Sequence, residues 1–308
     1  MGAVSVATCQ FPVGADIRAN VRFVKRQLRV ARERGADVAH FPEGALSGYA
    51  GSDFASFDGF DWDLLKAATL EVLRHARRLG IWVVLGSAHP LTGPHKPHNC
   101  LYVVSPAGQI IDRYDKRFCS GAPDSRSGDL AHYSPGRHFS VWDINGVRCG
   151  ALICYDYRFP ELYREYKRRG VDLMFHSFHA AHVTAERLEA MRADLGEEFV
   201  SANGAATFSL PGITMPAAMT AAAAGNHVWI SCPNSSAPQS LWPAFAVRAD
   251  GVTTGRLHRN VPGVLVTAVD TSAPLYDSTA AWRSRAMAGM LHSGRLPADP
   301  RSADRTGL

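Results

Sequence analysis

Three residues whose side chains can carry out acyl transfer follow apolar segments of this chain. Cys154 comes directly after CGALI, Glu43 follows VAHF and one proline, and Lys116 follows IIDRYD. A cysteine attacks as its thiolate, and because an ordinary thiol has a pKa of about 8.5, it needs a base or a cation nearby. Glu43 could take the thiol proton, while Lys116 could stabilise the thiolate and the oxyanion of a tetrahedral intermediate. This set predicts nucleophilic catalysis that requires no histidine.

The elements around these residues would place them together. Each apolar segment is typical of a buried strand, and the carboxyl ends of strands are where α/β folds carry their sites. After Cys154 the chain turns towards a helix predicted to begin at Pro160, so the backbone N–H of Tyr155 would be a second oxyanion donor. One such donor is typically worth about 100- to 1000-fold in rate. Taken singly, Cys154 is equally typical of a small core residue, and Glu43 or Lys116 of a surface charge.

The sequence segments around the three residues favour a catalytic interpretation over the structural one. FPEGALSGY surrounds Glu43, RYDKRF surrounds Lys116 and GALICYDYRFPEL surrounds Cys154. In this order they resemble the three signature segments of the nitrilase superfamily, the carbon-nitrogen hydrolases, and the resemblance covers about residues 3 to 270. It implies that Cys154 is the nucleophile, Glu43 the general base and later acid, and Lys116 the stabiliser of the transition state. The implied reaction cleaves a non-peptide C–N bond through a thioester and releases ammonia or an amine, without a metal or organic cofactor.

The residues after the nucleophile indicate a branch of the family. CYDYRFPEL resembles the amidase and carbamoylase branches, whereas members that cleave nitriles usually carry Trp-Glu directly after the cysteine. The resemblance therefore favours a small-molecule amide or N-carbamoyl substrate. Two alternatives stay open: nitrile hydrolysis, and a catalytically idle interaction module of the same fold. The intact set of Glu43, Lys116 and Cys154 argues against the second.

Further site residues are suggested by the resemblance. Many members have a second glutamate roughly 25 residues before the cysteine, and that place falls at Asp129 in SGDLAHYSPG. Asp129 is one methylene shorter, so it is either a catalytic support or an ordinary loop residue. Arg158 either pairs with a substrate carboxylate or serves structurally.

Three histidines in HSFHAAH, His176, His179 and His182, raise a zinc site as an alternative. The segment begins as a predicted strand, in which His176 and His179 point to opposite faces. The spacing drifts around a helix, and no HExxH motif follows. We therefore expect no metal, and we expect His179 to line the substrate pocket. The chain also has no GxSxG motif, which argues against a Ser-His-Asp hydrolase.

Buried strands alternate with amphipathic helices along the chain and are mixed with hairpins. This pattern predicts an α/β fold in which two stacked sheets have helices outside. The resemblance to nitrilases implies that this fold is an α-β-β-α sandwich of two mixed sheets flanked by helices. We expect a carbon-nitrogen hydrolase domain over 1–270, with an insertion around 183–214 that contains an extra helix. Residues 271–308 are predicted to form a C-terminal tail and a contact in a homodimer or higher homo-oligomer, because members of the family commonly dimerise.

Composition limits the possible partners. The 308 residues carry 33 basic and 28 acidic side chains, a formal net charge of +5, and the basic residues are spread along the chain. We therefore expect no nucleic-acid partner. No apolar run approaches the roughly 20 residues that span a bilayer, and the N-terminus lacks the pattern of a secretory signal, so we expect no membrane partner. The six cysteines form no CxxC pair, which favours reduced thiols and a cytoplasmic protein.

Overall fold

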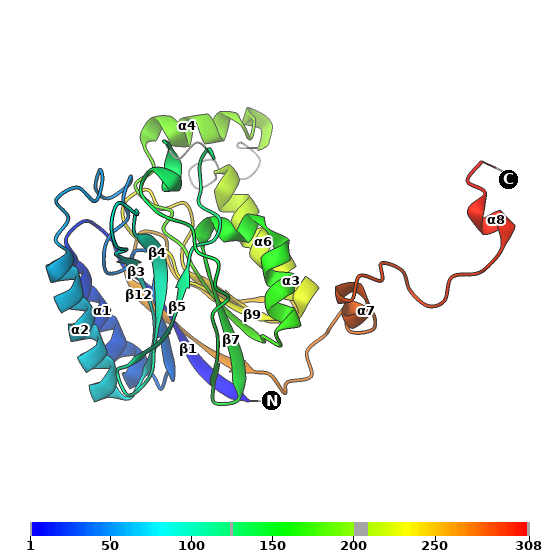
Figure 1. Cartoon of the computed structure of the whole chain (residues 1–308), viewed down its shortest axis with the longest axis horizontal. Helices are drawn as coiled ribbons and strands as arrows, with labels where there is room; N and C mark the ends of the chain where they lie inside the picture. Colours follow the sequence, from blue (N-terminus) through cyan, green and yellow to red (C-terminus); the bar gives the residue numbers. More distant parts are fainter. Residues whose placement is uncertain (1, 124–125, 200–208, 307–308) are drawn as a thin grey trace.

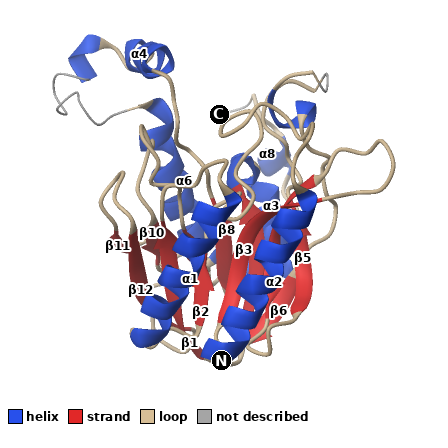
Figure 2. Ribbon diagram, turned by 90° about the vertical axis from the view of Figure 1, so that its left-hand side faces the viewer, coloured by secondary structure: helices blue, strands red, loops and turns tan. Residues whose placement is uncertain are grey.

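The computed structural model describes residues 2–123, 126–199 and 209–306. Two six-stranded sheets are stacked on each other (Figure 1). The helices α1 (Ile17–Glu33) and α2 (Trp62–Leu79) lie on the outside of one sheet, and α3 (Pro160–Arg168) and α6 (Leu210–Asn226) lie on the outside of the other. From the side, α1 and α2 run across the front of the first sheet (Figure 2). The predicted α-β-β-α sandwich is confirmed.

The first sheet has the strand order β12-β1-β2-β3-β4-β5. Its central strands β1, β2 and β3 are parallel, while β12, β4 and β5 join in antiparallel pairs. A hairpin joins β4 to β5, and Gly108 takes the positive φ of +73° that its turn requires. The strands are β1 (Ala3–Gln10), β2 (Val38–His40), β3 (Trp82–His89), β4 (His98–Val104), β5 (Ile110–Asp115) and β12 (Gly263–Asp270).

The second sheet has the order β11-β10-β9-β8-β7-β6, with β7, β8 and β9 parallel at its centre. A hairpin with Asn145 and Gly146 at its turn joins β6 to β7, and both turn residues have positive φ, as a two-residue hairpin turn favours. The strands are β6 (Val141–Ile144), β7 (Val147–Ile153), β8 (Leu173–Ser177), β9 (Trp229–Cys232), β10 (Phe245–Val247) and β11 (Thr253–Arg256).

Four helices cover the outer faces. They are α1 (Ile17–Glu33) and α2 (Trp62–Leu79) on the first sheet, and α3 (Pro160–Arg168) and α6 (Leu210–Asn226) on the second. Asp16 caps α1 by accepting hydrogen bonds from two N–H groups of its first turn, and apolar residues at helical spacing form its buried face. One core lies between α1, α2 and the first sheet, and the other extends from the interior of the sandwich to α3 and α6.

A buried polar link joins the two sheets below the strand ends. His40 of β2 contacts Ser231 of β9 through Nδ1 at 2.9 Å and Ser177 of β8 through Nε2 at 2.8 Å. Burial and the neighbouring His176 lower the pKa of His40 well below its usual value, so the link is neutral. Because a hydrogen bond needs a short distance and a nearly straight angle between donor and acceptor, this link fixes how the ends of β2 and β8 face each other.

Two parts of the described chain lie outside the sandwich. The first is α4 (Ala185–Ala193), which buries no side chain. It belongs to the predicted insertion around 183–214, whose residues 200–208 are outside the described part and whose last residues, from Leu210 on, belong to α6. After β12 the chain leaves the body and passes through α7 (Arg283–Met287) and α8 (Pro300–Ala303), as Figure 1 shows. Among the described helices, none has both the length and the apolar character needed to cross a bilayer.

Candidate active site

The structure brings Glu43, Lys116 and Cys154 together from three strand ends. Glu43 follows β2, Lys116 follows β5, and Cys154 follows β7. The Nζ atom of Lys116 lies 2.9 Å from Oε1 of Glu43, and the two side chains are 1% and 0% exposed. Both charges act on the Cys154 thiol. Three residues separated widely in sequence thus form one cluster, in which Glu43 and Lys116 are buried and Cys154 is partly buried.

Glu43 is held through both of its carboxylate oxygens. Its Oε1 accepts from Nδ2 of Asn99 at 2.7 Å as well as from Lys116, and its Oε2 accepts from the backbone N–H of His179 at 3.0 Å. Gly86 of β3 permits this position, because a Cβ there would lie 2.0 Å from the carbonyl oxygen of Pro42. The carboxylate is fixed by donors from three different elements.

Lys116 is a buried cation shared between two carboxylates. Besides Glu43, its Nζ contacts Oδ2 of Asp129 at 2.7 Å and the hydroxyl of Tyr49 at 3.4 Å. Burial alone would lower the pKa of Lys116, but the neighbouring acidic groups, Glu43 first among them, raise it well above its usual value. The side chain is therefore charged and can stabilise a developing oxyanion.

Asp129 lies in the 3-10 helix Gly128–Ala131 and is 3% exposed, so its place is unlike that of an ordinary solvated loop residue. Its Oδ2 accepts from the backbone N–H of Ser120 at 2.8 Å as well as from Lys116, and its Oδ1 accepts from the hydroxyl of Tyr49. Burial would raise the pKa of Asp129, but the charge of Lys116 and these hydrogen bonds lower it overall. Asp129 is thus an ionised partner of Lys116.

Cys154 begins the 3-10 helix Cys154–Arg158, at the predicted turn from strand to helix. Its φ of +42° lies in the left-handed region, where a residue with a Cβ is strained. Asp156 supports this turn: its carboxylate accepts from the N–H of Ile153 at 3.0 Å, the N–H of Phe118 at 2.9 Å and the hydroxyl of Tyr114 at 2.8 Å. Burial raises the pKa of Asp156 to about 6.

The electrostatics of the cluster define the protonation state of the Cys154 sulfur. Burial raises the pKa of the Cys154 thiol well above its usual value, and the charge of Glu43 and a hydrogen-bonding interaction with it add to the rise. Lys116 opposes this rise but is already shared with Asp129. The sulfur is therefore a thiol at neutral pH, and attack requires transfer of its proton, for which Glu43 is the adjoining acceptor.

The other residues suggested by the sequence lie around this cluster. Arg158 is exposed, and its guanidinium lies 4.7 Å from the ring centre of Tyr157. His179 donates its backbone N–H to Glu43, while its Nε2 lies 3.1 Å from Oδ2 of Asp53. The Nδ1 atom of His179 is buried and has no hydrogen-bond partner in the described structure. Substrate contacts by Arg158 and His179 stay predictions.

Sequence reasoning missed three supporting residues, namely Tyr49, Asn99 and Asp53. Tyr49 stands within the quoted segment FPEGALSGY but was given no role, and Asn99 opens an apolar strand whose pattern draws attention to its core residues. Asp53 makes close contacts with both His179 and His182, at 3.1 and 3.3 Å. The position of Tyr49 directly after Gly48 in the motif is the one signal that could have pointed to the site.

The three histidines of HSFHAAH do not lie together in one site. His176 contacts Tyr163 and the carbonyl of Cys154 in the interior, whereas His179 and His182 lie against Asp53. Across residues 2–123, 126–199 and 209–306, no group of three or more His, Cys, Asp or Glu side chains is arranged to hold a metal ion.

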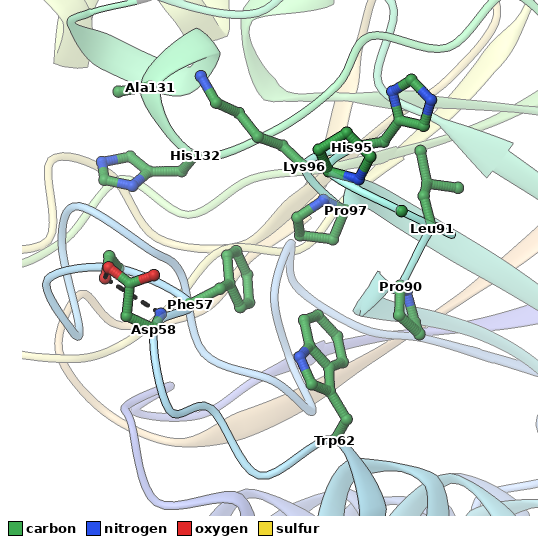
Figure 3. Close-up of a pocket in the computed structure, with 13 residues that line it drawn as sticks. Phe57, Asp58, Trp62, Pro90, Leu91, His95, Lys96, Pro97, Ala131 and His132 are labelled. Atoms are coloured by element: carbon green, nitrogen blue, oxygen red, sulfur yellow. Dashed lines mark hydrogen bonds between the residues drawn. The ribbon is translucent and has the colours of Figure 1, made fainter.

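A pocket of about 390 Å³ borders the helix that carries Asp129 (Figure 3). Lys96 forms part of its wall and donates through Nζ to the carbonyl of Leu130 at 2.5 Å. Glu43, Lys116 and Cys154 are not among its lining residues, so this pocket does not contain the cluster. It is lined by Ser56, Phe57, Asp58, Trp62, Pro90, Leu91, Gly93, Pro94, His95, Lys96, Pro97, Ala131 and His132.

Known proteins share both the sequence pattern and the fold. The chain is 30% identical over 152 residues to the 2-oxoglutaramate amidase of Bacillus subtilis, covering 49% of this chain and 56% of that protein. It is 28% identical over 178 residues to an omega-amidase of Xenopus laevis, covering 56% and 63%. The chain therefore matches less than two thirds of the length of these relatives.

Solved structures extend the likeness over most of the fold. A mutant of an amidase from Nesterenkonia AN1, described as a member of the nitrilase superfamily, has a TM-score of 0.70 at 22% identity and covers 94% of this chain and 98% of its own. A mutant of the same amidase in complex with butyramide has a TM-score of 0.68 at 22% identity, covering 87% and 91%. Residues 5–273 match the family described as carbon-nitrogen hydrolase. The chain therefore belongs to the carbon-nitrogen hydrolase family.

Proposed function

We propose that this enzyme hydrolyses the C–N bond of a small amide or N-carbamoyl compound through a thioester on Cys154, with release of ammonia or an amine. The observation that carries the proposal is the buried contact of Lys116 with Glu43, next to a thiol at a strained strand end. A cation, a base and a nucleophile at one place are the groups that acyl transfer to sulfur requires.

We assign each step of this reaction to a residue. Glu43 accepts the Cys154 proton as sulfur attacks the carbonyl carbon, and Lys116 stabilises the resulting oxyanion together with the N–H of Tyr155. Glu43 then gives the proton to the departing nitrogen, which leaves as ammonia or an amine. The acyl group stays on Cys154 as a thioester. Water, activated by Glu43, attacks the thioester, and the thiol is restored as the product leaves, a carboxylic acid from an amide or carbamic acid from an N-carbamoyl compound. Asp129 holds Lys116 in position throughout.

Relatives support the substrate class. Two matched proteins are named 2-oxoglutaramate amidase and omega-amidase, and the amidase of similar fold was solved with butyramide. A mutant of that amidase carries the acetamide moiety of fluoroacetamide covalently on its active-site cysteine. Within this class we propose that His179 contacts the substrate, because its buried Nδ1 has no hydrogen-bond partner in the described structure. Arg158, exposed beside the turn, is the residue we assign to a substrate carboxylate.

The test is ammonia release from three panels of compounds: aliphatic and ω-amides, N-carbamoyl amino acids, and nitriles. Hydrolysis of amides or N-carbamoyl compounds by the wild type, lost in Cys154→Ala and accompanied by an acyl adduct in intact-mass spectra, would support the proposal. Faster turnover of nitriles than of amides would assign the other branch of the family. Absence of turnover and of any adduct across all panels would favour an idle interaction module.

We also propose that the unit 1–270 carries the reaction and that the tail 271–308 joins copies of the chain into a homo-oligomer. The tail exposes large apolar side chains, with Leu291 at 86% and Trp282 at 52%. Arg168 of α3 donates to the carbonyl of Met287 at 2.7 Å, which places α3 beside the tail. Light scattering on Trp282→Asp and Leu291→Asp should show smaller particles than the wild type. Leu70→Asp on α2 should leave the mass unchanged.

A further inference from the structure

His176 makes a contact with the nucleophile turn that the catalytic cluster does not explain. It lies in β8, is fully buried, and its Nε2 is 3.1 Å from the carbonyl oxygen of Cys154. Its Nδ1 is 2.6 Å from the hydroxyl of Tyr163 on α3. Its ring stacks on Phe178, with centroids 4.4 Å apart and planes 10° from parallel. The imidazole is therefore fixed on three sides.

These contacts define the protonation of the ring. A carbonyl oxygen only accepts, so Nε2 of His176 carries the hydrogen and donates it to Cys154. Burial lowers the pKa of His176 to about 3, so the ring is neutral and Nδ1 accepts from Tyr163. The sulfur of Met219, 3.2 Å from the same hydroxyl, is a weaker acceptor. Tyr163 thereby selects the tautomer in which His176 can donate.

The acceptor of this hydrogen bond belongs to the peptide that joins Cys154 to Tyr155. In a planar trans peptide, the carbonyl oxygen and the following N–H point in opposite directions. A donor that holds the oxygen of Cys154 towards the core therefore also holds the N–H of Tyr155 away from it. The helix begins at Cys154, so this N–H belongs to the first turn, whose donors have no partner within the helix.

We propose that His176 is a positioning residue that orients the Cys154–Tyr155 peptide so that the N–H of Tyr155 stabilises the oxyanion, with Tyr163 fixing the tautomer of His176. The inference rests on the proposed acyl transfer, in which that oxyanion forms. The turn needs such a restraint, because Cys154 has a φ of +42° and a strained residue persists only where its surroundings determine it. His176 supplies the restraint from β8, whose register pairs it with Leu152 of β7.

The test compares His176→Phe, which keeps a ring but has no donor, with His176→Gln, whose Nε2 can still donate. A rotated donor is a misplacement of the kind that costs about 100-fold, so His176→Phe should lower kcat by about that factor while KM changes little. His176→Gln should restore most of kcat. Tyr163→Phe should give a smaller loss, because the donating tautomer is then no longer selected. The matched control is His138→Phe, a histidine whose side chain is 57% exposed.

A second measurement separates positioning from damage to the fold. Alkylation of Cys154 by iodoacetamide forms no oxyanion, so its rate, followed by intact mass, should be the same in the wild type and the His176 variants. A full kcat in His176→Phe would overturn the inference, and so would a parallel fall of kcat and alkylation in both His176→Phe and His176→Gln. A wild type that hydrolyses no amide, N-carbamoyl compound or nitrile would instead refute the proposed function, and the inference with it.

Discussion

The ammonium of Lys116 lies 2.7 Å from the carboxylate of Asp129, and both side chains are buried. The same ammonium contacts Glu43 at 2.9 Å, so one cation lies between two carboxylates. Asp129 thereby limits how strongly Lys116 pairs with Glu43. A base that is fully paired with a cation is a weak proton acceptor, whereas a base next to a shared cation retains more of its basicity.

Asp129→Asn tests this relationship. The amide keeps the size of the side chain but removes its charge, so Lys116 should move towards Glu43 and reduce its ability to accept the thiol proton. We expect kcat for amide hydrolysis to fall by about 10- to 100-fold, a part of what general base catalysis contributes. Steady-state kinetics measure this. Asp112→Asn, outside the cluster, serves as the control, and an unchanged kcat in Asp129→Asn would show that Lys116 needs no second carboxylate.

Lys116→Met should destabilise the fold as well as abolish activity. It leaves Glu43 and Asp129 buried without their cation, and breaking a buried pair in this way typically costs about 3–5 kcal/mol in free energy of unfolding. Urea unfolding measures the loss. Lys25→Met breaks the ion pair of Lys25 with Glu71, whose side chains are 34% and 40% exposed, so it should cost much less free energy of unfolding. Adding Glu43→Gln and Asp129→Asn to Lys116→Met should recover stability, and failure to recover it would mean that the loss comes from packing.

The meeting of Glu43, Lys116 and Cys154 could be predicted because each residue follows an apolar run that forms a strand. Two of these strands, β2 and β5, belong to the first sheet and β7 belongs to the second, which is stacked on it. Asn99 could not be predicted, because its contact with Glu43 depends on how β4 lies relative to β2 two strands away. The sequence could not decide whether Asp129 supports the site or is an ordinary loop residue, because only the folded loop shows that its shorter side chain reaches Lys116. The contact of His179 with Glu43 uses its backbone, which residue type does not reveal.

Acid should remove part of the stability that Asp129 provides. Its pKa is lowered in the folded state, so the folded protein binds the proton less readily than the unfolded chain does. The contribution is present above the unfolded pKa of about 3.9 and is lost as the pH falls through the lower, folded pKa. The stability difference between the wild type and Asp129→Asn should therefore shrink as the pH falls below about 4. Urea unfolding over this range measures it, and a gap that does not depend on pH would contradict the assignment.

The reactivity of Cys154 towards iodoacetamide should reveal what holds it as a thiol. Burial and Glu43 raise its pKa well above the usual value, so alkylation should be slow at neutral pH and should still be rising above pH of about 9. Glu43→Gln removes the carboxylate charge and its interaction with the thiol, while Lys116 remains to stabilise the thiolate. Alkylation of this variant at neutral pH should therefore be faster than that of the wild type.

The same Glu43→Gln variant should lose amide hydrolysis, by about 100- to 10,000-fold, because the amide cannot accept the thiol proton or return it to the leaving nitrogen. Faster alkylation together with slower hydrolysis would separate the two effects of Glu43, which keeps the resting sulfur protonated and yet provides the base for attack. Cys154→Ala identifies the labelled site, and peptide mapping excludes Cys119, the other cysteine that is not fully buried. If alkylation and hydrolysis fall together in Glu43→Gln, the carboxylate acts mainly by generating the thiolate. That outcome would contradict its role in keeping the resting sulfur protonated.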